Sequence, residues 1–315
     1  MLGSPLWHVK WFADPAPYPT RYDLLITVPV LAALAVAMIA VGAAYAWQRR
    51  FPEPRTVKRL ERFAPLAPTV LGFHLGLALL VAAVVGLLFV PALQIPSDTA
   101  LGFGILTVEA MCGLMILAGL ATRIAAVLLA LLGIVAMSVA GFTFESILEQ
   151  IHILGIAIFL FLVGRGPLSL DRLRGAGPPV RSAEIPSASL MLIRVMLGFG
   201  IFYSALTEKL LNPALAGSLL EARPFLNVMG FAGVSDGQFV FLAGLTELVI
   251  GAVLMSPFVT RPVAAIGAVI FTASLPFFGW SELLGHLPFY GIMFLLFIAP
   301  KADSRRVRGA MQARA

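Results

Sequence analysis

Long runs of apolar residues, separated by short segments rich in charged residues, proline and glycine, dominate the chain. A helix that crosses the hydrocarbon core of a bilayer needs roughly 17–25 such residues. Isolated segments in lipid must satisfy their own backbone hydrogen bonds, and the sequence lacks the alternating pattern of a barrel, so the runs are predicted to be helices. Nine transmembrane helices are expected, near 24–46, 68–90, 100–120, 124–141, 149–163, 188–207, 238–256, 263–278 and 286–299.

Composition supports an all-α integral membrane protein in contact with the lipid bilayer. The chain is 60% hydrophobic and 12% charged, with a mean hydropathy of +0.96. A soluble domain carries about 25% charged residues, so half that share could not keep a surface wetted. The net charge of +6 follows the connections between helices, and no nucleic-acid partner is expected. Cys112 is the single cysteine, which excludes an intramolecular disulfide or a dithiol site.

The basic residues predict the orientation of the helices. They gather in alternate connections, chiefly 47–67, 164–186 and 301–315, which the positive-inside rule places in the cytoplasm. The other connections hold only Lys10, Arg21, Lys209 and Arg223. The N-terminus is therefore expected outside and the C-terminus in the cytoplasm.

A cleaved signal peptide is the alternative for the first span. Ala44-Tyr45-Ala46 resembles a cleavage site, but the apolar stretch exceeds the usual length of about 7–15 residues. Cleavage would also place the basic stretch 49–62 outside, against the charge rule.

The sequence contains an internal repeat. A glutamate, a glycine, a threonine and an arginine of one stretch recur later in the chain with the same spacing between them. A further stretch, which precedes each of these, aligns His74 with Arg194. The matching segments are Val108–Gly113 with Thr246–Gly251, Ala121–Ala126 with Val259–Ala264, Gly155–Phe161 with Gly291–Phe297, and Leu71–His74 with Met191–Arg194.

Each copy holds four expected helices, an even number, so the two modules are predicted to be parallel repeats that share one orientation. The expected organisation is a head, first helix and basic linker at 1–66, a first module at 67–172, a linker at 173–186, a second module at 187–300 and a basic tail at 301–315.

Residues 66–300 resemble the DoxX family of four-helix membrane proteins, here in tandem. The matching pieces of the first copy are Glu109, Gly113, Gly119, Thr122-Arg123 and Gly164–Asp171; those of the second are Arg194, Gly198, Phe202, Ser204–Leu210, Glu247, Gly251 and Thr260-Arg261. His74 stands where the family usually carries arginine, Val90-Pro91 where a lysine is expected, and the second copy has lost the ending that Gly164–Asp171 supplies in the first. The resemblance implies a site split between the copies or retained in one.

The resemblance implies a bacterial-type inner-membrane protein linked to a redox system. Family relatives include subunits of thiosulfate:quinone oxidoreduction and membrane partners of periplasmic oxidoreductases. A quinone-linked subunit is therefore one expected function. A transporter with a site between its modules is a second, and a non-catalytic scaffold for a partner oxidoreductase is a third.

His74, Glu109, Arg194 and Glu247 are ionisable and lie well inside expected spans, away from their ends, where an unpaired charge is costly. Matched depths in neighbouring antiparallel helices predict the pairs Arg194–Glu247 and His74–Glu109. Such pairs either fix helix packing or, through the histidine, take part in proton transfer. Arg123 and Arg261 are expected to anchor helix ends at the cytoplasmic surface.

A second group of candidates lies at the expected outer ends of the helices, interleaved with aromatic residues: Glu145, Glu149, His152, Glu208, Lys209, Trp280, Glu282 and His286. This pattern is typical of an interfacial belt, and it also suits a pocket for a quinone, with rings for stacking and acids for proton exchange. Ligation of haem by His152 and His286 is a further, less favoured interpretation. The segment 212–237 is predicted to lie over this face as an amphipathic stretch.

Overall fold

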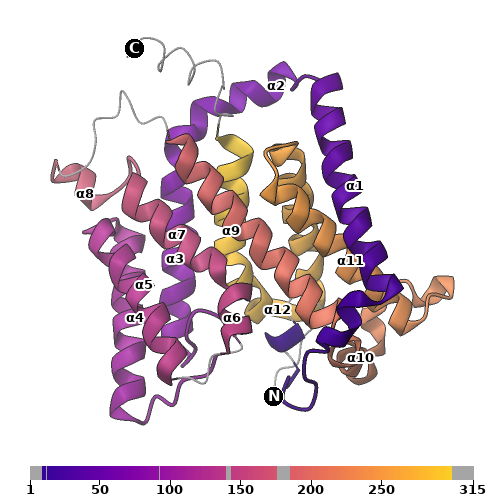
Figure 1. Cartoon of the computed structure of the whole chain (residues 1–315). Coiled ribbons are helices and arrows are strands. Elements are labelled where there is room, and N and C mark those ends of the chain that lie inside the picture. Colours follow the sequence, from indigo (N-terminus) through magenta and orange to yellow (C-terminus); the bar gives the residue numbers. More distant parts are fainter. Residues whose placement is uncertain (1–8, 12, 92, 140–142, 176–184, 300–315) are drawn as a thin grey trace.

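The computed structural model describes residues 9–299 except 12, 92, 140–142 and 176–184, and the described chain is helical (Figure 1). Its helices are α1 (Val28–Arg50), α2 (Arg55–Lys58), α3 (Ala67–Val84), α4 (Ala100–Ala118), α5 (Thr122–Val139), α6 (Phe144–Glu149), α7 (Ile151–Val163), α8 (Leu170–Leu173), α9 (Ser187–Ala205), the π-helical turn η5 (Leu206–Leu210), α10 (Pro213–Ala222), α11 (Asp236–Met255) and α12 (Thr260–Ile298). Short 3₁₀ turns lie at η1 (Val9–Trp11), η2 (Tyr22–Ile26), η3 (Arg59–Leu66), η6 (Pro224–Leu226) and η7 (Gly230–Ala232).

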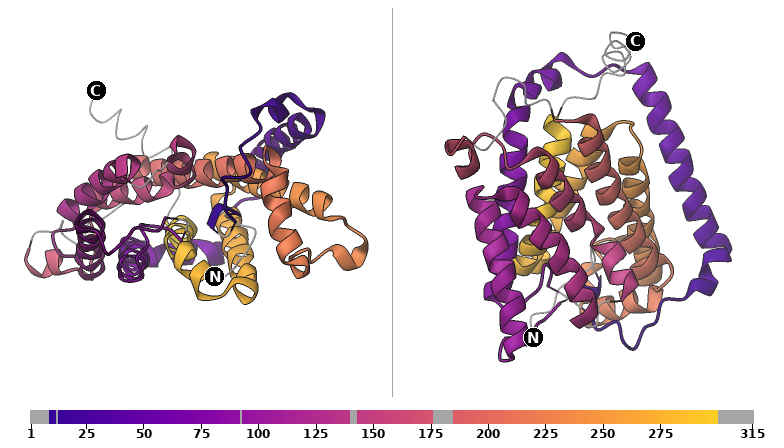
Figure 2. Two further views of the ribbon diagram at one scale, coloured as in Figure 1. Left: turned by 90° about the horizontal axis from the view of Figure 1, so that it is seen from below. Right: turned by 60° about the vertical axis from the view of Figure 1, so that its left-hand side comes forward.

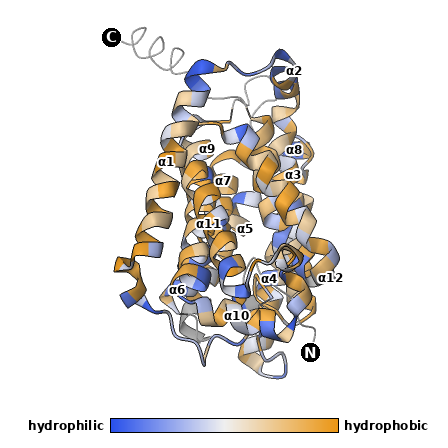
Figure 3. Cartoon of the chain, turned by 90° about the vertical axis from the view of Figure 1, so that its right-hand side faces the viewer, coloured by the Kyte–Doolittle hydropathy of each residue, from blue (hydrophilic) through white to orange (hydrophobic). Residues whose placement is uncertain are grey.

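Six helices of the described chain are long and apolar enough to cross a membrane, and three shorter apolar helices accompany them. The prediction of a helical, multi-pass membrane protein is therefore confirmed. Hydrophobic colours run along the helices, and polar colours gather near α2 and near α6 at opposite ends of the bundle (Figure 3). We name these the α2 end and the α10 end, because α10 lies at the same end of the bundle as α6 (Figure 1).

The helix α12 contains two apolar segments, Thr260–Phe277 and Glu282–Ile298. Gly279 separates them with φ 70° and ψ −157°, a backbone conformation that residues with a Cβ avoid. The chain turns there at the α10 end, and Figure 1 shows the halves as separate orange and yellow helices. The sequence prediction of two helices in this stretch therefore agrees with the backbone.

Helices α3 and α4 cross at two glycines, and α9 and α11 cross in the same way. A Cβ on Gly113 would lie 2.9 Å from the carbonyl oxygen of Gly76, and a Cβ on Gly251 would lie 2.6 Å from that of Gly198. Backbones in membrane proteins reach such contact only where small residues meet. The α3–α4 pair and the α9–α11 pair therefore cross with the same kind of close backbone contact.

The two predicted modules pack against each other reciprocally. Helix α7 lies on α9, where Gly155 meets the side chain of Met196, and the last part of α12 lies on α3, where Gly291 meets His74. A two-fold related pair of units makes such matched contacts. The packing supports the duplication, which stays a prediction. It also changes the alignment of the two copies, because His74 then corresponds to Met196 rather than to Arg194.

The segment after α7 ties three helices together at the α2 end. Arg165 donates from its guanidinium to the carbonyl oxygens of Ile116 at 3.1 Å and Leu117 at 2.8 Å, at the end of α4. Asp171 accepts from the N–H groups of Ala121 at 2.6 Å and Thr122 at 2.9 Å, at the start of α5. These bonds satisfy groups that helix ends leave unpaired, which gives the Gly164–Asp171 motif a structural role.

Replacing Asp171 by alanine is expected to lower the stability of the protein by about 1–2 kcal/mol, because the first turn of α5 loses its acceptor. Partial burial would raise the pKa of Asp171, but the hydrogen bonds from Thr122 and Ala121 outweigh it and hold the pKa below 3.8. This stabilisation is present above pH 3.8 and is lost as the pH falls through the lowered pKa. Thermal unfolding at neutral and acid pH measures the difference, with the exposed Asp98→Ala as control; an equal effect in both variants would contradict it.

Helix α1 lies along one side of the bundle (Figure 2). It packs on α11 through small residues, among them Ala33 and Ala37, and its other faces remain exposed.

The linker after α1 is fixed by Arg261, whose guanidinium donates to Glu53 and to Glu61, both at 2.8 Å. Arg261 is only 2% exposed, so the expectation that it anchors the helix end at the membrane surface was wrong; its two carboxylate partners hold it inside the fold.

Candidate functional site

Charged side chains are buried together at the α10 end of the bundle. We call them the buried polar cluster: Lys10, Glu149, Glu208, Lys209, Glu247 and Glu282. All the members except Lys10 are at most 3% exposed, and the Lys10 side chain is 12% exposed. They come from the N-terminal segment, α6, η5, α11 and α12, so elements far apart in the sequence form the cluster.

The inner part of the cluster is an ion pair between Lys209 and Glu247. The ammonium lies 2.8 Å from a carboxylate oxygen of Glu247, and Lys209 is 1% exposed. The end of α9 widens into the π-helical turn η5, a distortion often found at functional positions. Gly244 on α11 leaves room for Lys209, since a Cβ there would lie 3.1 Å from the lysine Cβ.

Glu282 and His286 extend the cluster along α12. One oxygen of Glu282 accepts from the Ser274 hydroxyl at 3.0 Å and lies 3.6 Å from Nε2 of His286. The other oxygen has no hydrogen-bond partner within the described residues. Phenyl rings pack against the imidazoles of this region, with Phe271 4.5 Å from His286 and Phe289 4.1 Å from His152 between ring centres.

The N-terminal segment covers the cluster. The backbone N–H of Val9, which is fully buried, donates to a carboxylate oxygen of Glu208. The Lys10 ammonium lies 2.6 Å from Glu149 and 3.2 Å from Glu145. The Thr207 hydroxyl donates to the same Glu149 oxygen at 2.8 Å.

Three groups of this cover have shifted pKa values. Burial, together with the nearby Glu208, raises the pKa of Glu149 to about 7, although the Lys10 ammonium acts to lower it. Burial would lower the pKa of Lys10, but Glu149 and Glu208 outweigh it and raise it above 10.5. Partial burial would raise the pKa of Glu145, but the hydrogen bond from Tyr22 and the Lys10 charge hold it below 4.5. At neutral pH, Lys10 is therefore an ammonium and Glu145 a carboxylate, whereas the surroundings of Glu149 favour its protonated form.

The inner charges do not balance without a proton. Lys209 contacts Glu247 and is also an electrostatic neighbour of Glu208 and Glu282, so one ammonium faces three carboxyl groups. A surplus buried carboxylate is costly. Neutrality of the buried polar cluster, with its two lysines and four glutamates, therefore requires two protons, held by its carboxyl groups or by the imidazole of His286. The arrangement can bind and release a proton away from bulk water.

The predicted first module holds a buried glutamate that would correspond to Glu247 of the Lys209–Glu247 pair. Glu109 on α4 is fully buried, and one of its oxygens accepts from the backbone N–H of Phe89 at 2.7 Å. Its other oxygen has no hydrogen-bond partner within the part of the chain described. Phe89 adopts φ 63°, uncommon for a residue with a side chain. A backbone amide thus takes the place that Lys209 has in the second module.

The structure does not form the two charge pairs predicted from helix depths. Glu247 contacts Lys209 and not Arg194, because the π-helical turn brings Lys209 back against α11. His74 bonds the carbonyl oxygen of Val70 at 2.8 Å, while Glu109 bonds Phe89. Equal depth in neighbouring helices therefore did not identify the partners.

The candidates predicted at the outer ends of the helices do lie in one region. Glu145, Glu149, Glu208, Lys209, Glu282 and His286 belong to the buried polar cluster or contact it, and His152 lies against Phe289 beside it. The side chain of Trp280 is outside the described residues. Apart from Glu145, whose side chain is 22% exposed, these groups are buried, so they are not the solvated charges of an interfacial belt.

Sequence reasoning missed Lys10, Thr20, Tyr22 and Thr207. Tyr22 and Thr20 both donate to Glu145, the latter at 3.1 Å. Lys10 had one available signal: it is among the few cations in connections that otherwise lack them. The segment 212–237 does cover this end, but Leu215, Leu219 and Leu220 of α10 pack on Val9 instead of facing lipid headgroups.

No family model, curated protein or solved structure matches this chain.

Proposed function

We propose that the chain crosses a bacterial-type inner membrane nine times, with its N-terminus outside and its C-terminus in the cytoplasm. The six long apolar helices, together with the three shorter ones at Thr122–Val135, Ile151–Val163 and Glu282–Ile298, are equal in number to the nine proposed spans, which supports this count. The basic segments 47–67 and 164–186 begin and end at or near the α2 end, which supports a cytoplasmic α2 end and an outer α10 end.

We infer that the protein is the membrane subunit of a redox system, as its DoxX-like sequence implies, and that the buried polar cluster holds the protons of that reaction. The observation that carries this proposal is the surplus of buried carboxyl groups around Lys209. Reduction of a quinone, and oxidation or reduction of thiols, moves protons together with electrons. A cluster that holds protons near the outer surface would serve a partner oxidoreductase bound on that side of the membrane.

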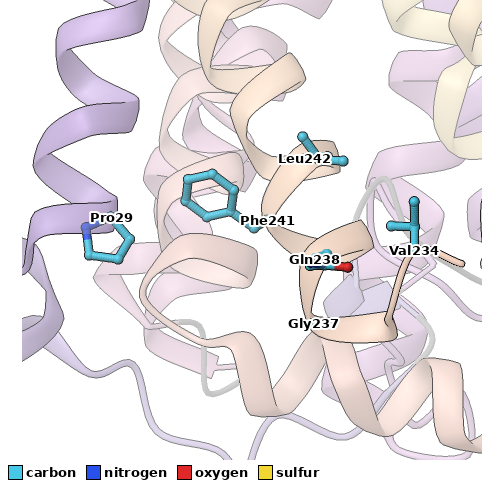
Figure 4. Close-up of a pocket in the computed structure, with 6 residues that line it drawn as sticks. All are labelled: Pro29, Val234, Gly237, Gln238, Phe241 and Leu242. Carbon is cyan, nitrogen blue, oxygen red and sulfur yellow. The ribbon is translucent and has the colours of Figure 1, made fainter.

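One cavity in the described part of the chain offers only some of the groups that would bind a quinone. This cavity of about 560 Å³ lies between α1 and α11 (Figure 4). It is lined by Pro29, Val234, Gly237, Gln238, Phe241 and Leu242. The amide oxygen of Gln238 already accepts from Ser235 at 2.9 Å. The lining suits an apolar chain and offers a quinone ring few proton donors, so we assign no proton step to a quinone here.

Two measurements on the purified protein test the redox proposal. Infrared titration between about pH 5 and about pH 8 is expected to show protonation of buried carboxyl groups, reduced in Glu282→Gln and unchanged in the exposed Asp98→Asn. A saturating soluble quinone analogue, or the copurifying oxidoreductase, is expected to raise the thermal midpoint. A wild-type protein that binds neither and shows no carboxyl protonation would contradict the proposal.

A proton-coupled transporter is the second candidate, favoured by the position of the cluster. It lies where α6 and α7 of the first module meet α9 and α12 of the second, and sites at the interface between repeats are typical of transporters built from repeats. Flux in proteoliposomes that is lost in Glu247→Gln and kept in Glu109→Gln would support it. A scaffold would show no flux and would tolerate both substitutions.

A further inference from the structure

The N-terminal segment makes a continuous set of polar contacts from the surface to the buried polar cluster. At the surface, Tyr22 and Thr20 donate to Glu145, whose side chain is 22% exposed. The Glu145 carboxylate contacts the Lys10 ammonium, which in turn contacts Glu149, 3% exposed. Exposure therefore falls at each step.

Lys10 brings the two carboxyl groups of α6 to one point. A carboxylate oxygen of Glu145 and one of Glu149 both lie within 3.2 Å of its nitrogen. The residues are four apart on a short helix, where two carboxylates would otherwise repel each other. The ammonium offsets this repulsion, so Lys10 acts as a positioning residue for both.

Glu149 also faces the interior of the cluster. It accepts from the Thr207 hydroxyl at 2.8 Å and is an electrostatic neighbour of Glu208. Glu208 neighbours Lys209, which reaches Glu247 and Glu282. The contacts from Glu145 to the inner carboxyl groups are thus unbroken.

We propose that Glu145, Lys10 and Glu149 form the route by which protons from the outer solution reach the buried polar cluster. This inference rests on the proposed proton-holding role of the cluster. A proton from water binds Glu145, and the carboxyl groups gathered around Lys10 exchange it, so that one proton leaves Glu145, one arrives on Glu149, and Lys10 remains an ammonium. The N-terminal segment therefore supplies part of the route and is more than a cover.

The groups that face this route are few in the described chain. They are Lys10, Thr20 and Tyr22 from the N-terminal segment, Glu145 and Glu149 from α6, Tyr203 from α9, and Thr207, Glu208 and Lys209 from η5. A low pKa at Glu145 and a pKa of about 7 at Glu149 let a proton pass inward to the stronger base.

A pH jump on the full-length purified protein, followed by infrared detection of buried carboxyl groups, tests the route. Glu145→Gln and Lys10→Met are expected to slow protonation of the inner groups about tenfold or more, and Glu145→Gln, which lies outside the buried polar cluster, is expected to keep the final extent of their protonation. Lys10→Arg should restore the rate in part. Asp23→Asn, an exposed carboxylate in the same segment, is the control and should leave the rate unchanged.

The outcomes separate this inference from the proposed function. Inner groups of Glu145→Gln that protonate at the wild-type rate, in a variant with the wild-type thermal midpoint, would overturn the route while the proton-holding role stands. A wild-type protein whose inner groups never protonate would overturn both. If Lys10→Met unfolds, Glu145→Gln and Tyr22→Phe decide the question, because neither removes a buried charge.

Discussion

Replacing Lys209 by methionine is expected to destabilise the protein by about 3–5 kcal/mol, the usual result of leaving one member of a buried ion pair without its partner. Glu247 would keep its place among buried carboxyl groups, with Glu208 and Glu282 as neighbours and the ammonium gone. Methionine fills most of the volume of the lysine stem, so the loss reflects charge more than packing. Unfolding by denaturant in detergent micelles measures it.

Two variants control this result. The double variant of Lys209→Met with Glu247→Gln should recover part of the loss, since it removes both charges. Glu109→Gln in the first module should be nearly neutral, because the amide oxygen can still accept from Phe89. Equal losses for Lys209→Met and Glu109→Gln would show that the two modules do not differ as the structure indicates.

The second large effect is expected at the crossing of α9 and α11. Gly251→Ala should cost about 1–3 kcal/mol or more, because the added Cβ would lie 2.6 Å from the carbonyl oxygen of Gly198 and from the nitrogen of Phe202. Both atoms are backbone, so the helices must separate. That separation would move η5, and with it Lys209, away from Glu247.

Gly104→Ala is the matched control, as nothing lies within 4 Å of a Cβ at that position of α4. Alanine is the better helix former by about 1 kcal/mol, so this variant should be neutral or more stable. Gly113→Ala should resemble Gly251→Ala. Thermal midpoints of the three variants suffice, and a harmless Gly251→Ala would show that this crossing is looser than the structure indicates.

The membrane class and the helical architecture could be read from the sequence because they depend on local properties. An apolar run of sufficient length has few alternatives to a helix in lipid. The same reasoning found the polar residues at helix ends, and most of them lie in the region that holds the buried polar cluster. The predicted repeat rests on the sequence around Glu109, which recurs around Glu247.

The partners of charged residues could not be read in this way. Arg194 and Glu247 were matched by depth, but η5 brings Lys209 to Glu247 first. Arg261 has the spacing of a surface anchor, and only the fold of the 51–66 linker places Glu53 and Glu61 on it. Successive side chains of an α-helix point in different directions around its axis, and a π-helical turn changes these directions. Depth in the membrane alone therefore does not determine which side chains meet.

The sequence alone thus determined a helical chain in a membrane, its repeated pattern and the identity of most polar groups, since each follows from short-range periodicity and the cost of burying charge. Tertiary structure alone decided which groups meet. It brought Lys10, separated by more than a hundred residues from Glu149, into contact with that carboxyl group. Such long-range contacts depend on how all the helices pack together, and no local pattern encodes them.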